Sequence, residues 1–231
     1  MKINILGRLK AKAYSVFAKD IHSALLADER VKFEQLRQID AAGETVELLN
    51  YASSKQVGIN TYRSLHDGLG YSENNWAFDL VDEPEIVDGK SFFEFGAGNG
   101  AFLELLRKKG KTVGGVDLIN PRSLPEVITG DFKLAFESDL WRNADVCYSA
   151  DFLEHLELTE LESLFTAWAV QGKRHLHLIA CYDDQISHKT VMPPHLWALL
   201  LSRYFKHVDI RAVYYRRYPC KKEAVVLAFQ N

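Results

Sequence analysis

The sequence predicts an α/β protein with a mostly parallel sheet and helices on both faces. From residue 91 onward, short apolar runs alternate with patterns of helical period, which is typical of a parallel sheet covered on both faces. The last two apolar runs are joined only by the segment RRYPCKK, which is too short for the crossover that parallel neighbours require. We therefore expect a seven-stranded sheet in which the last strand is reversed.

An N-terminal helical extension, residues 1–88, is expected to precede the α/β domain, residues 89–231. Apolar residues recur at helical spacing over 9–25, and shorter helical patterns follow over 31–39 and 46–51. The stretch 58–75 is rich in Gly, Ser, Asn and Tyr and predicts a loop. This extension is the expected cap over the pocket of the second region.

The elements of the α/β domain follow from its buried runs and helix signals. A helix is expected over 100–109, ending at Gly110. Thr159 and Glu162 have capping-box spacing and predict a helix that stops before Gly172, and Pro193 and Pro194 predict the start of another. The expected strands are 92–95, 112–118, 127–128, 144–150, 175–181, 207–215 and 223–229.

The composition excludes several classes of protein. The chain has 231 residues, with 28 Lys and Arg against 31 Asp and Glu, and a net charge of −3. It can bury a core without metals or disulfides, and its charge gives no general attraction to nucleic acid or to an anionic membrane. Cys147, Cys181 and Cys220 form no C-x-x-C pair, so we expect reduced thiols in a cytoplasmic protein without a structural zinc. The first 17 residues fit neither a signal peptide nor a membrane span.

The segment FFEFGAGNG, residues 92–100, is the most informative motif. It places Gly96, Gly98 and Gly100 at the end of a buried strand and the start of a helix. Glycines there let a ligand touch the backbone, and the N–H groups of the next helix face the same crevice. A glycine-rich turn alone is weak support for a nucleotide site, so the surrounding residues decide its meaning.

Acidic residues recur at the predicted carboxyl ends of consecutive strands. Glu94 lies in the first strand, and Asp117, Asp131 and Asp151 follow at the ends of the second, third and fourth. Open α/β sheets bind ligands at this edge, and a carboxylate about 20 residues after the glycines can accept hydrogen bonds from ribose hydroxyls. The expected crevice is acidic and suits a cation better than a pyrophosphate.

These motifs together resemble the Rossmann-like core of class I S-adenosylmethionine-dependent methyltransferases. The resemblance covers about 140 of the 231 residues. E-F-G-A-G-N-G matches the first motif, Val116-Asp117-Leu118 the second and Gly130-Asp131-Phe132 the third. The fourth is matched by Ala144-Asp145-Val146 and the run Asp151-Phe152-Leu153-Glu154-His155-Leu156. The closing antiparallel pair matches the reversed last strand of that family.

The resemblance implies S-adenosylmethionine as cofactor and assigns it a set of residues. Asp117 would hold the ribose hydroxyls, Asp131 and Phe132 would contact adenine, and Ala150 and Asp151 would lie where the methionine part meets the acceptor. The implied cofactor residues are Glu94, Gly96, Ala97, Gly98, Gly100, Asp117, Leu118, Asp131, Phe132 and Ala150. The match specifies the cofactor and is almost silent about the acceptor.

Catalysis would depend mainly on alignment, because the sulfonium methyl group is already activated. An oxygen acceptor of high pKa would also need a base, for which His155 and His188 are the candidates beside Asp151. No metal ligands are predicted.

Tyr62, Tyr71 and Trp76 precede the first motif and are candidates for a lid, although aromatic segments more often pack as core.

Three functions are compatible with these residues. The first is methyl transfer to an O or N atom of a small molecule or saccharide. The second is a nicotinamide-dependent oxidoreductase, since Gly96, Gly98 and Ala101 also fit G-x-G-x-x-G/A. The third is a catalytically silent cofactor-binding protein with the same fold.

The segment Y-S-A-D-F-L-E lacks the elements of base-directed methyltransferases, so nucleic acid is disfavoured as a partner. We expect no membrane contact and allow a homodimer.

Overall fold

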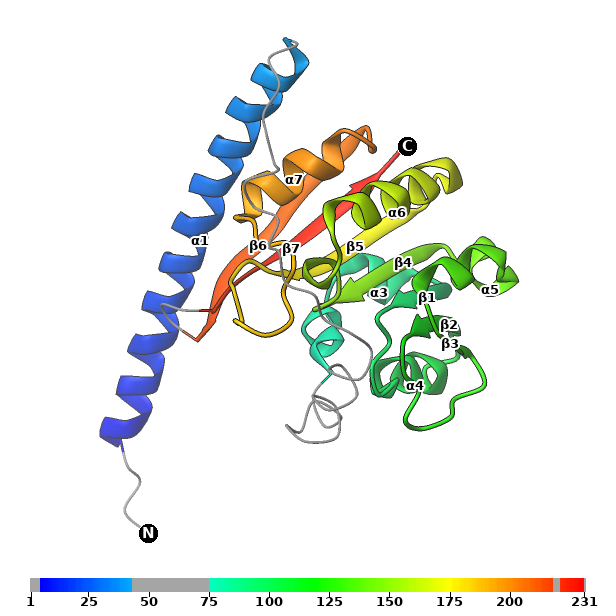
Figure 1. Cartoon of the computed structure of the whole chain (residues 1–231). Coiled ribbons are helices and arrows are strands. Elements are labelled where there is room, and N and C mark those ends of the chain that lie inside the picture. Colours follow the sequence, from blue (N-terminus) through cyan, green and yellow to red (C-terminus); the bar gives the residue numbers. More distant parts are fainter. Residues whose placement is uncertain (1–4, 43–74, 218–220, 231) are drawn as a thin grey trace.

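The computed structural model describes residues 5–42, 75–217 and 221–230 of the chain. Its centre is a seven-stranded sheet in the order β3-β2-β1-β4-β5-β7-β6 (Figure 1). β7 runs antiparallel to both β5 and β6, whereas the other neighbours are parallel. The predicted α/β sheet with a reversed last strand is therefore confirmed. The strands are β1 (Ser91–Phe95), β2 (Thr112–Asp117), β3 (Val127–Thr129), β4 (Val146–Ala150), β5 (Arg174–Ala180), β6 (His207–Arg217) and β7 (Lys221–Phe229).

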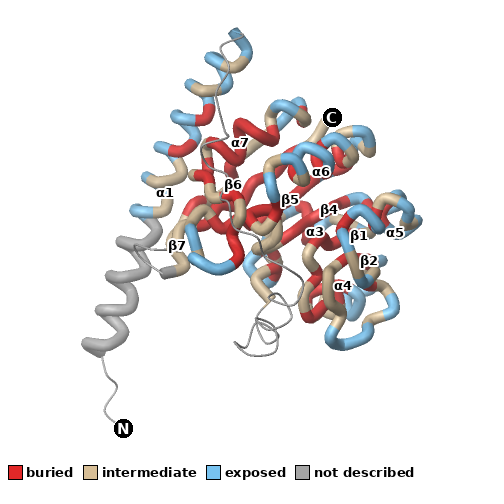
Figure 2. The backbone as a smooth tube through the Cα atoms, in the orientation of Figure 1, coloured by how far each residue is buried: buried red, intermediate tan, exposed pale blue. Residues whose placement is uncertain are grey.

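Apolar side chains alternate between the two faces of the sheet, as period-two strands require. In β1, Phe93 and Phe95 join the core on one face and Phe92 joins the core on the other. Buried residues are concentrated in the strands and in parts of the helices that cover them (Figure 2). One face is covered by α5 (Asp139–Arg142), α6 (Leu158–Gln171) and α7 (Pro194–Ser202), and the other by η2 (Trp76–Leu80), α3 (Pro84–Asp88) and α4 (Ala101–Lys108).

The N-terminal helix α1 (Ile5–Ala41) is one continuous helix, where the sequence predicted two patterns. It lies beside β6 and α7 (Figure 1). Glu29 fixes it there, because its buried carboxylate pairs with His195 at 2.5 Å and with Lys222 at 3.1 Å. These contacts lower the pKa of Glu29 to about 2 against the opposing effect of burial. The helical pattern predicted over 46–51 lies outside the described residues.

Residues 76–88 pack into the α/β core. Ala77, Leu80 and Ile86 from η2 and α3 are buried together with Phe92 of β1. These residues lie ahead of the predicted boundary at 88/89, which stays a prediction. Among the described helices, none combines the length and hydrophobicity that a membrane span needs.

The start of α6 differs from the sequence prediction. Its capping box is formed by Glu157 and Glu160, two residues before the predicted Thr159 and Glu162. The Glu160 carboxylate accepts a hydrogen bond from the Glu157 N–H at 2.8 Å. Glutamate is an infrequent N-cap, so the preference for Thr misplaced the start. The predicted end is confirmed, since Gly172 is the C-cap with φ +65°.

Candidate functional site

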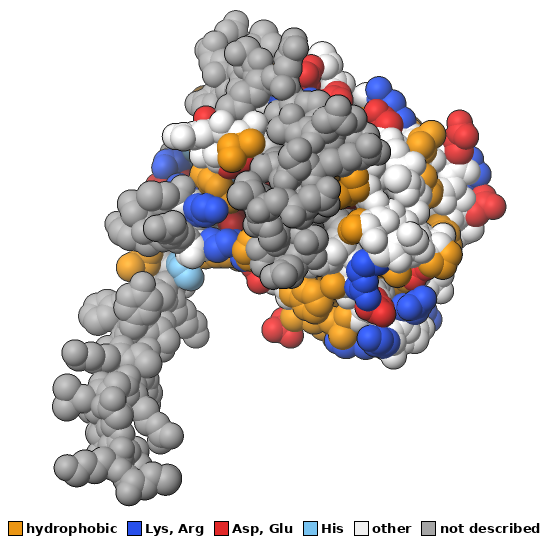
Figure 3. All heavy atoms as spheres, turned by 60° about the horizontal axis from the view of Figure 1, so that its bottom comes forward, with side chains coloured by type: hydrophobic (Ala, Val, Ile, Leu, Met, Phe, Trp, Pro, Cys, Tyr) orange, Lys and Arg blue, Asp and Glu red, His pale blue; other side chains and the backbone are white. Residues whose placement is uncertain are grey.

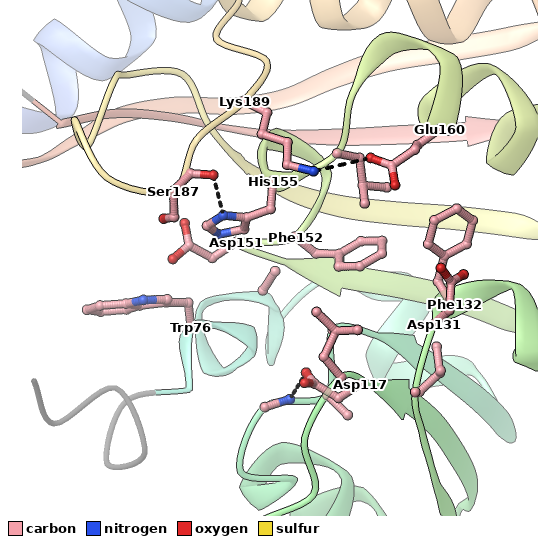
Figure 4. A pocket seen from close by; sticks show the side chains of 18 of the residues that line it. Trp76, Asp117, Asp131, Phe132, Asp151, Phe152, His155, Glu160, Ser187 and Lys189 are labelled. Atoms are coloured by element: carbon pink, nitrogen blue, oxygen red, sulfur yellow. Dashed lines mark hydrogen bonds and ion pairs between the residues drawn. The ribbon is translucent and has the colours of Figure 1, made fainter. Parts of the chain in front are cut away.

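A pocket opens at the carboxyl edge of β1, β2 and β4, where parallel strands of an open sheet present their ends. Its lining divides into two sides in Figure 4. We call the first the turn side, made of Gly98, Asp117, Asp131 and Phe132. We call the second the β4 side, made of Trp76, Asp151 and His155.

The glycine turn after β1 leaves open space in front of the backbone. Gly98 has φ +54°, and a Cβ atom built on it would meet no other atom within 4 Å. Gly96 differs, because a Cβ there would lie 2.9 Å from the Phe152 side chain. Gly100 is the N-cap of α4, and its Cβ would lie 2.2 Å from Leu124. Only Gly98 of the three therefore keeps space clear on the pocket side.

Asp117 at the end of β2 is held by two backbone amides. Its Oδ2 accepts from the Gly98 N–H at 2.7 Å, and its Oδ1 accepts from the Ile119 N–H at 3.0 Å. The carboxylate is thereby fixed at the floor of the pocket, beside the open turn (Figure 4). Carboxylates held in this way are acceptors for hydroxyl donors.

The first amides of the turn and of α4 are already occupied. Gly98 N–H donates to Asp117, and the Ala101 N–H donates to the Asn99 side chain at 2.9 Å. A pyrophosphate bound at a helix N-terminus uses such amides as its donors. The local arrangement thus favours a ligand that is not a phosphate.

Asp131 and Phe132 form the far wall of the turn side (Figure 4). Asp131 caps the short helix η3 (Phe132–Glu137) by accepting from the Lys133 N–H at 2.9 Å. Phe132 is buried and packs edge-on against Phe152, with ring centroids 6.4 Å apart. An aromatic face beside a carboxylate suits a flat ring that carries hydrogen-bond donors.

The β4 side is built from the segment after β4 and from η2. Asp151 has φ +57°, an uncommon conformation for a residue other than glycine. His155, at the end of η4 (Leu153–His155), donates through Nδ1 to the Ser187 carbonyl at 3.2 Å. Burial lowers the pKa of His155 to about 4, assisted by nearby His188, so its ring is neutral near pH 7. The Arg216 guanidinium stacks on Trp76 at 3.7 Å.

His188 lies behind His155 and does not line the pocket. Their ring centroids are 4.9 Å apart, and Nδ1 of His188 donates to the Tyr182 carbonyl at 2.6 Å. Asp184 orders this loop, because it accepts from the N–H groups of Ile186, Ser187 and His188. These bonds lower the pKa of Asp184 well below its usual range despite burial.

Glu94 is buried beneath the pocket. Its carboxyl accepts a hydrogen bond from the Tyr148 hydroxyl at 3.1 Å, and the side chain is 1% exposed. Burial raises the pKa of Glu94 well above its ordinary value, with a smaller contribution from Asp117. It supports the sheet under the glycine turn and is absent from the pocket lining.

The predicted site residues are therefore mostly brought together. Of the ten predicted cofactor residues, all but Glu94 and Gly100 line this pocket, and of the three predicted catalytic residues, Asp151 and His155 do. Tyr62 and Tyr71 lie outside the described residues, whereas Trp76 lines the pocket. The lining residues that were not predicted as site residues are Asn75, Val116, Gly130, Phe152, Leu156, Glu160, Ser187 and Lys189.

Ser187 and Lys189 carried no sequence signal, because they reach the pocket from the loop after β5. The backbone N–H groups of Lys189 and Thr190 donate to the Glu154 carbonyl and tie this loop to η4. The Lys189 ammonium lies 3.6 Å from Glu160 and 3.7 Å from Glu157, which offsets its charge at the pocket rim. The only nearby residue predicted from the sequence was His188, which lies between Ser187 and Lys189.

Comparison with known proteins gives matches in structure. No protein-family model and no curated protein matches the sequence. A 1,6-didemethyltoxoflavin-N1-methyltransferase from Burkholderia thailandensis, solved with S-adenosylhomocysteine, aligns with a TM-score of 0.57 at 12% identity, over 78% of this chain and 94% of that one. An N-methyltransferase from Bradyrhizobium japonicum in complex with S-adenosyl-L-homocysteine aligns with a TM-score of 0.50 at 15% identity, over 74% and 100%.

The chain spans only 47% of another matched structure, a pericyclic reaction enzyme, with 14% identity, 68% coverage of this chain and a TM-score of 0.46. At these identities the likenesses show the fold alone. The chain has the Rossmann-like fold of class I S-adenosylmethionine-dependent methyltransferases, as the sequence motifs predicted.

Proposed function

We propose that the protein is an S-adenosylmethionine-dependent methyltransferase that methylates an O or N atom of a small molecule or saccharide. The observation that carries the proposal is the acidic pocket at the carboxyl edge of the sheet, where Gly98 leaves open space beside the fixed carboxylate of Asp117. Asp117, Asp131 and Asp151 all line it, which suits a cationic sulfonium.

The residues present fit the methyl donor from end to end. Asp117 would accept hydrogen bonds from the ribose hydroxyls, and Asp131 with Phe132 would contact the adenine. Gly96, Ala97 and Ala150 would border the methionine part. The fit to a dinucleotide is poorer, because the Gly98 and Ala101 amides are already bonded to Asp117 and Asn99. Because these amides are already hydrogen-bonded, they count against the alternative function of a nicotinamide-dependent oxidoreductase.

Bound S-adenosylmethionine supplies an activated methyl group, and the chain has to align the acceptor and exclude water. Trp76, Asp151 and His155 border the acceptor end in this proposal. A histidine with a pKa of about 4 removes a proton from a hydroxyl poorly, so alignment by the β4 side matters more than proton abstraction. His188 acts through His155 as a positioning residue.

Two features support a small acceptor over nucleic acid. Acidic and basic side chains are both spread over the described part of the face drawn in Figure 3. Arg216, from the basic run before the last strand, bonds to Asp79 and Glu223 and is only partly exposed. Its charge is therefore committed within the fold and does not form a phosphate-binding surface.

The test is transfer of labelled methyl groups. The full chain is incubated with methyl-labelled S-adenosylmethionine and a deproteinised small-molecule extract, and labelled product and S-adenosylhomocysteine are quantified. We expect both to form in equal amounts. A Gly98→Leu variant is expected to lose the activity, and the matched Gly110→Leu variant to keep it. Binding of the donor without any transfer would favour the catalytically silent alternative.

A further inference from the structure

Four side chains converge next to the β4 side of the pocket. They are Asp151, Glu154, His155 and His188, and each offers one oxygen or ring nitrogen, all within 4.8 Å of one another. We call these four residues the carboxylate–histidine cluster. Three come from the segment after β4 and His188 comes from the loop after β5, so the sheet topology brings them together.

Glu154 is the observation that requires a partner at this place. Its side chain is fully buried, and Oε1 accepts from the Ala180 N–H at 3.1 Å. The other oxygen, Oε2, is buried with no hydrogen-bond partner among the described residues. A buried carboxylate oxygen without a hydrogen-bond partner is costly, and the Asp151 carboxylate converges on the same place. A cation between the two carboxylates would remove this cost.

The histidines are oriented as metal ligands are. His155 donates through Nδ1 to the Ser187 carbonyl, and His188 donates through Nδ1 to the Tyr182 carbonyl. Backbone carbonyls that fix the tautomer in this way turn the Nε2 atom of each ring toward the remaining ligand. The Asp184 bonds to the loop amides hold His188 in place before any ligand arrives.

We propose that the carboxylate–histidine cluster binds one divalent transition-metal cation. Two carboxylates and two imidazoles form a mixed oxygen and nitrogen set, which suits Mn²⁺ or Zn²⁺ better than Mg²⁺ or Ca²⁺. Ligand atoms about 2.1 Å from a common ion lie at most about 4.2 Å apart. The 4.8 Å spread therefore closes with shifts of a few tenths of an ångström.

The cation would also act on the acceptor, a consequence that rests on the proposed function. Asp151 and His155 line the same pocket as the cofactor residues. A six-coordinate ion held by four protein atoms keeps two positions for other ligands, so it favours an acceptor with two adjacent oxygen atoms. Metal coordination lowers the pKa of a bound hydroxyl, so the cation would activate such an acceptor.

The test is binding of Mn²⁺ to the full chain after treatment with a chelator and dialysis. Loss of the electron paramagnetic resonance signal of free Mn²⁺ gives stoichiometry and affinity, and Zn²⁺ is tested by competition. We expect one Mn²⁺ per chain, and at least tenfold weaker binding in Glu154→Gln and in His188→Asn. The control His207→Asn removes an exposed histidine outside the cluster and is expected to bind as wild type does.

The proposal fails if the wild-type chain leaves the Mn²⁺ signal unchanged at millimolar concentration and Zn²⁺ does not bind. It also fails if both cluster variants, shown by circular dichroism to be folded, bind like wild type. A parallel calorimetric titration with S-adenosylmethionine in chelator separates this outcome from failure of the proposed function. Donor binding without metal binding overturns only the cation site, and the reverse result overturns only the methyltransferase proposal.

Discussion

The two sides of the pocket are built in different ways. The turn side uses strand ends and backbone amides: Asp117 is bonded to the amides of Gly98 and Ile119, and Asp131 caps a short helix. The β4 side adjoins the carboxylate–histidine cluster, which joins η4 to a loop more than 30 residues further along the chain. The first arrangement depends on bonds made close to the strand ends, and the second on a contact between segments far apart in the sequence.

Filling the open space at the glycine turn is expected to have the largest effect. Gly98→Leu places a side chain where the pocket is open, so the affinity for S-adenosylmethionine should fall at least 100-fold, about 3 kcal/mol. Gly110→Leu is the matched control, because Gly110 has φ +78° and equally open surroundings outside the pocket. Both should lose stability to backbone strain. Equal donor affinities by calorimetry would contradict the assignment of the turn side.

Removal of the fixed carboxylate is expected to have the next largest effect. Asp117→Ala leaves the Gly98 and Ile119 amides without their acceptor and takes away the predicted ribose partner. Donor affinity should fall by about 1–3 kcal/mol. The control Asp139→Ala removes an exposed aspartate that pairs only with its helix neighbour Arg142. If calorimetry gives the wild-type affinity for Asp117→Ala, this residue does not belong to the binding site.

The buried acid beneath the turn side predicts a dependence of stability on pH. The pKa of Glu94 is raised in the folded state, so its stabilisation is complete below the ordinary value of 4.5 and is lost as pH rises through the folded pKa. Glu94→Gln keeps an acceptor for Tyr148 and should remove this loss of folding stability. The loss is about 1.4 kcal/mol for each pH unit by which the folded pKa exceeds the unfolded pKa. Thermal melts across pH test it, with the exposed Glu34→Gln as control. Parallel pH profiles of wild type and Glu94→Gln would show that Glu94 is not responsible.

A change in the carboxylate–histidine cluster should have the smallest effect on the donor. His188 is outside the pocket lining, so His188→Asn should change the affinity for S-adenosylmethionine by less than about twofold, or 0.4 kcal/mol. The measurement is calorimetry in the presence of chelator. A loss as large as that of Asp117→Ala would mean that the two sides are not separable.

The sequence was sufficient to predict that the turn-side residues lie together, for a physical reason. Glycines at a strand end and acids at the next strand ends are local features, and strand order follows from connection length. Glu94, also predicted there, lies outside the pocket lining, because this strand residue next to the turn points to Tyr148. The ion pairs of Arg216 with Glu223 and of Lys222 with Glu29 could not be predicted from the sequence, because they depend on the folded sheet and on the position of α1.

The arrangement of the β4 side could be predicted from the sequence only in part. The spacing of Asp151, Glu154 and His155 places two carboxylates and an imidazole close together in the chain, yet no metal ligands were predicted from the sequence. The sequence near His188 does not show that it lies beside these three residues. The loop is held there by hydrogen bonds from its backbone N–H groups to the Glu154 carbonyl and to the Asp184 carboxylate. The position of helix α1 could likewise not be predicted from the sequence, since it depends on the ion pairs of Glu29 with His195 and Lys222.

The central claim is that this pocket holds S-adenosylmethionine, and calorimetry on the full chain tests it most directly. Separate titrations use S-adenosylmethionine, S-adenosylhomocysteine and NAD. We predict binding of both sulfur compounds at one site per chain and no binding of NAD. Binding of NAD with neither sulfur compound bound would contradict the account and favour the oxidoreductase.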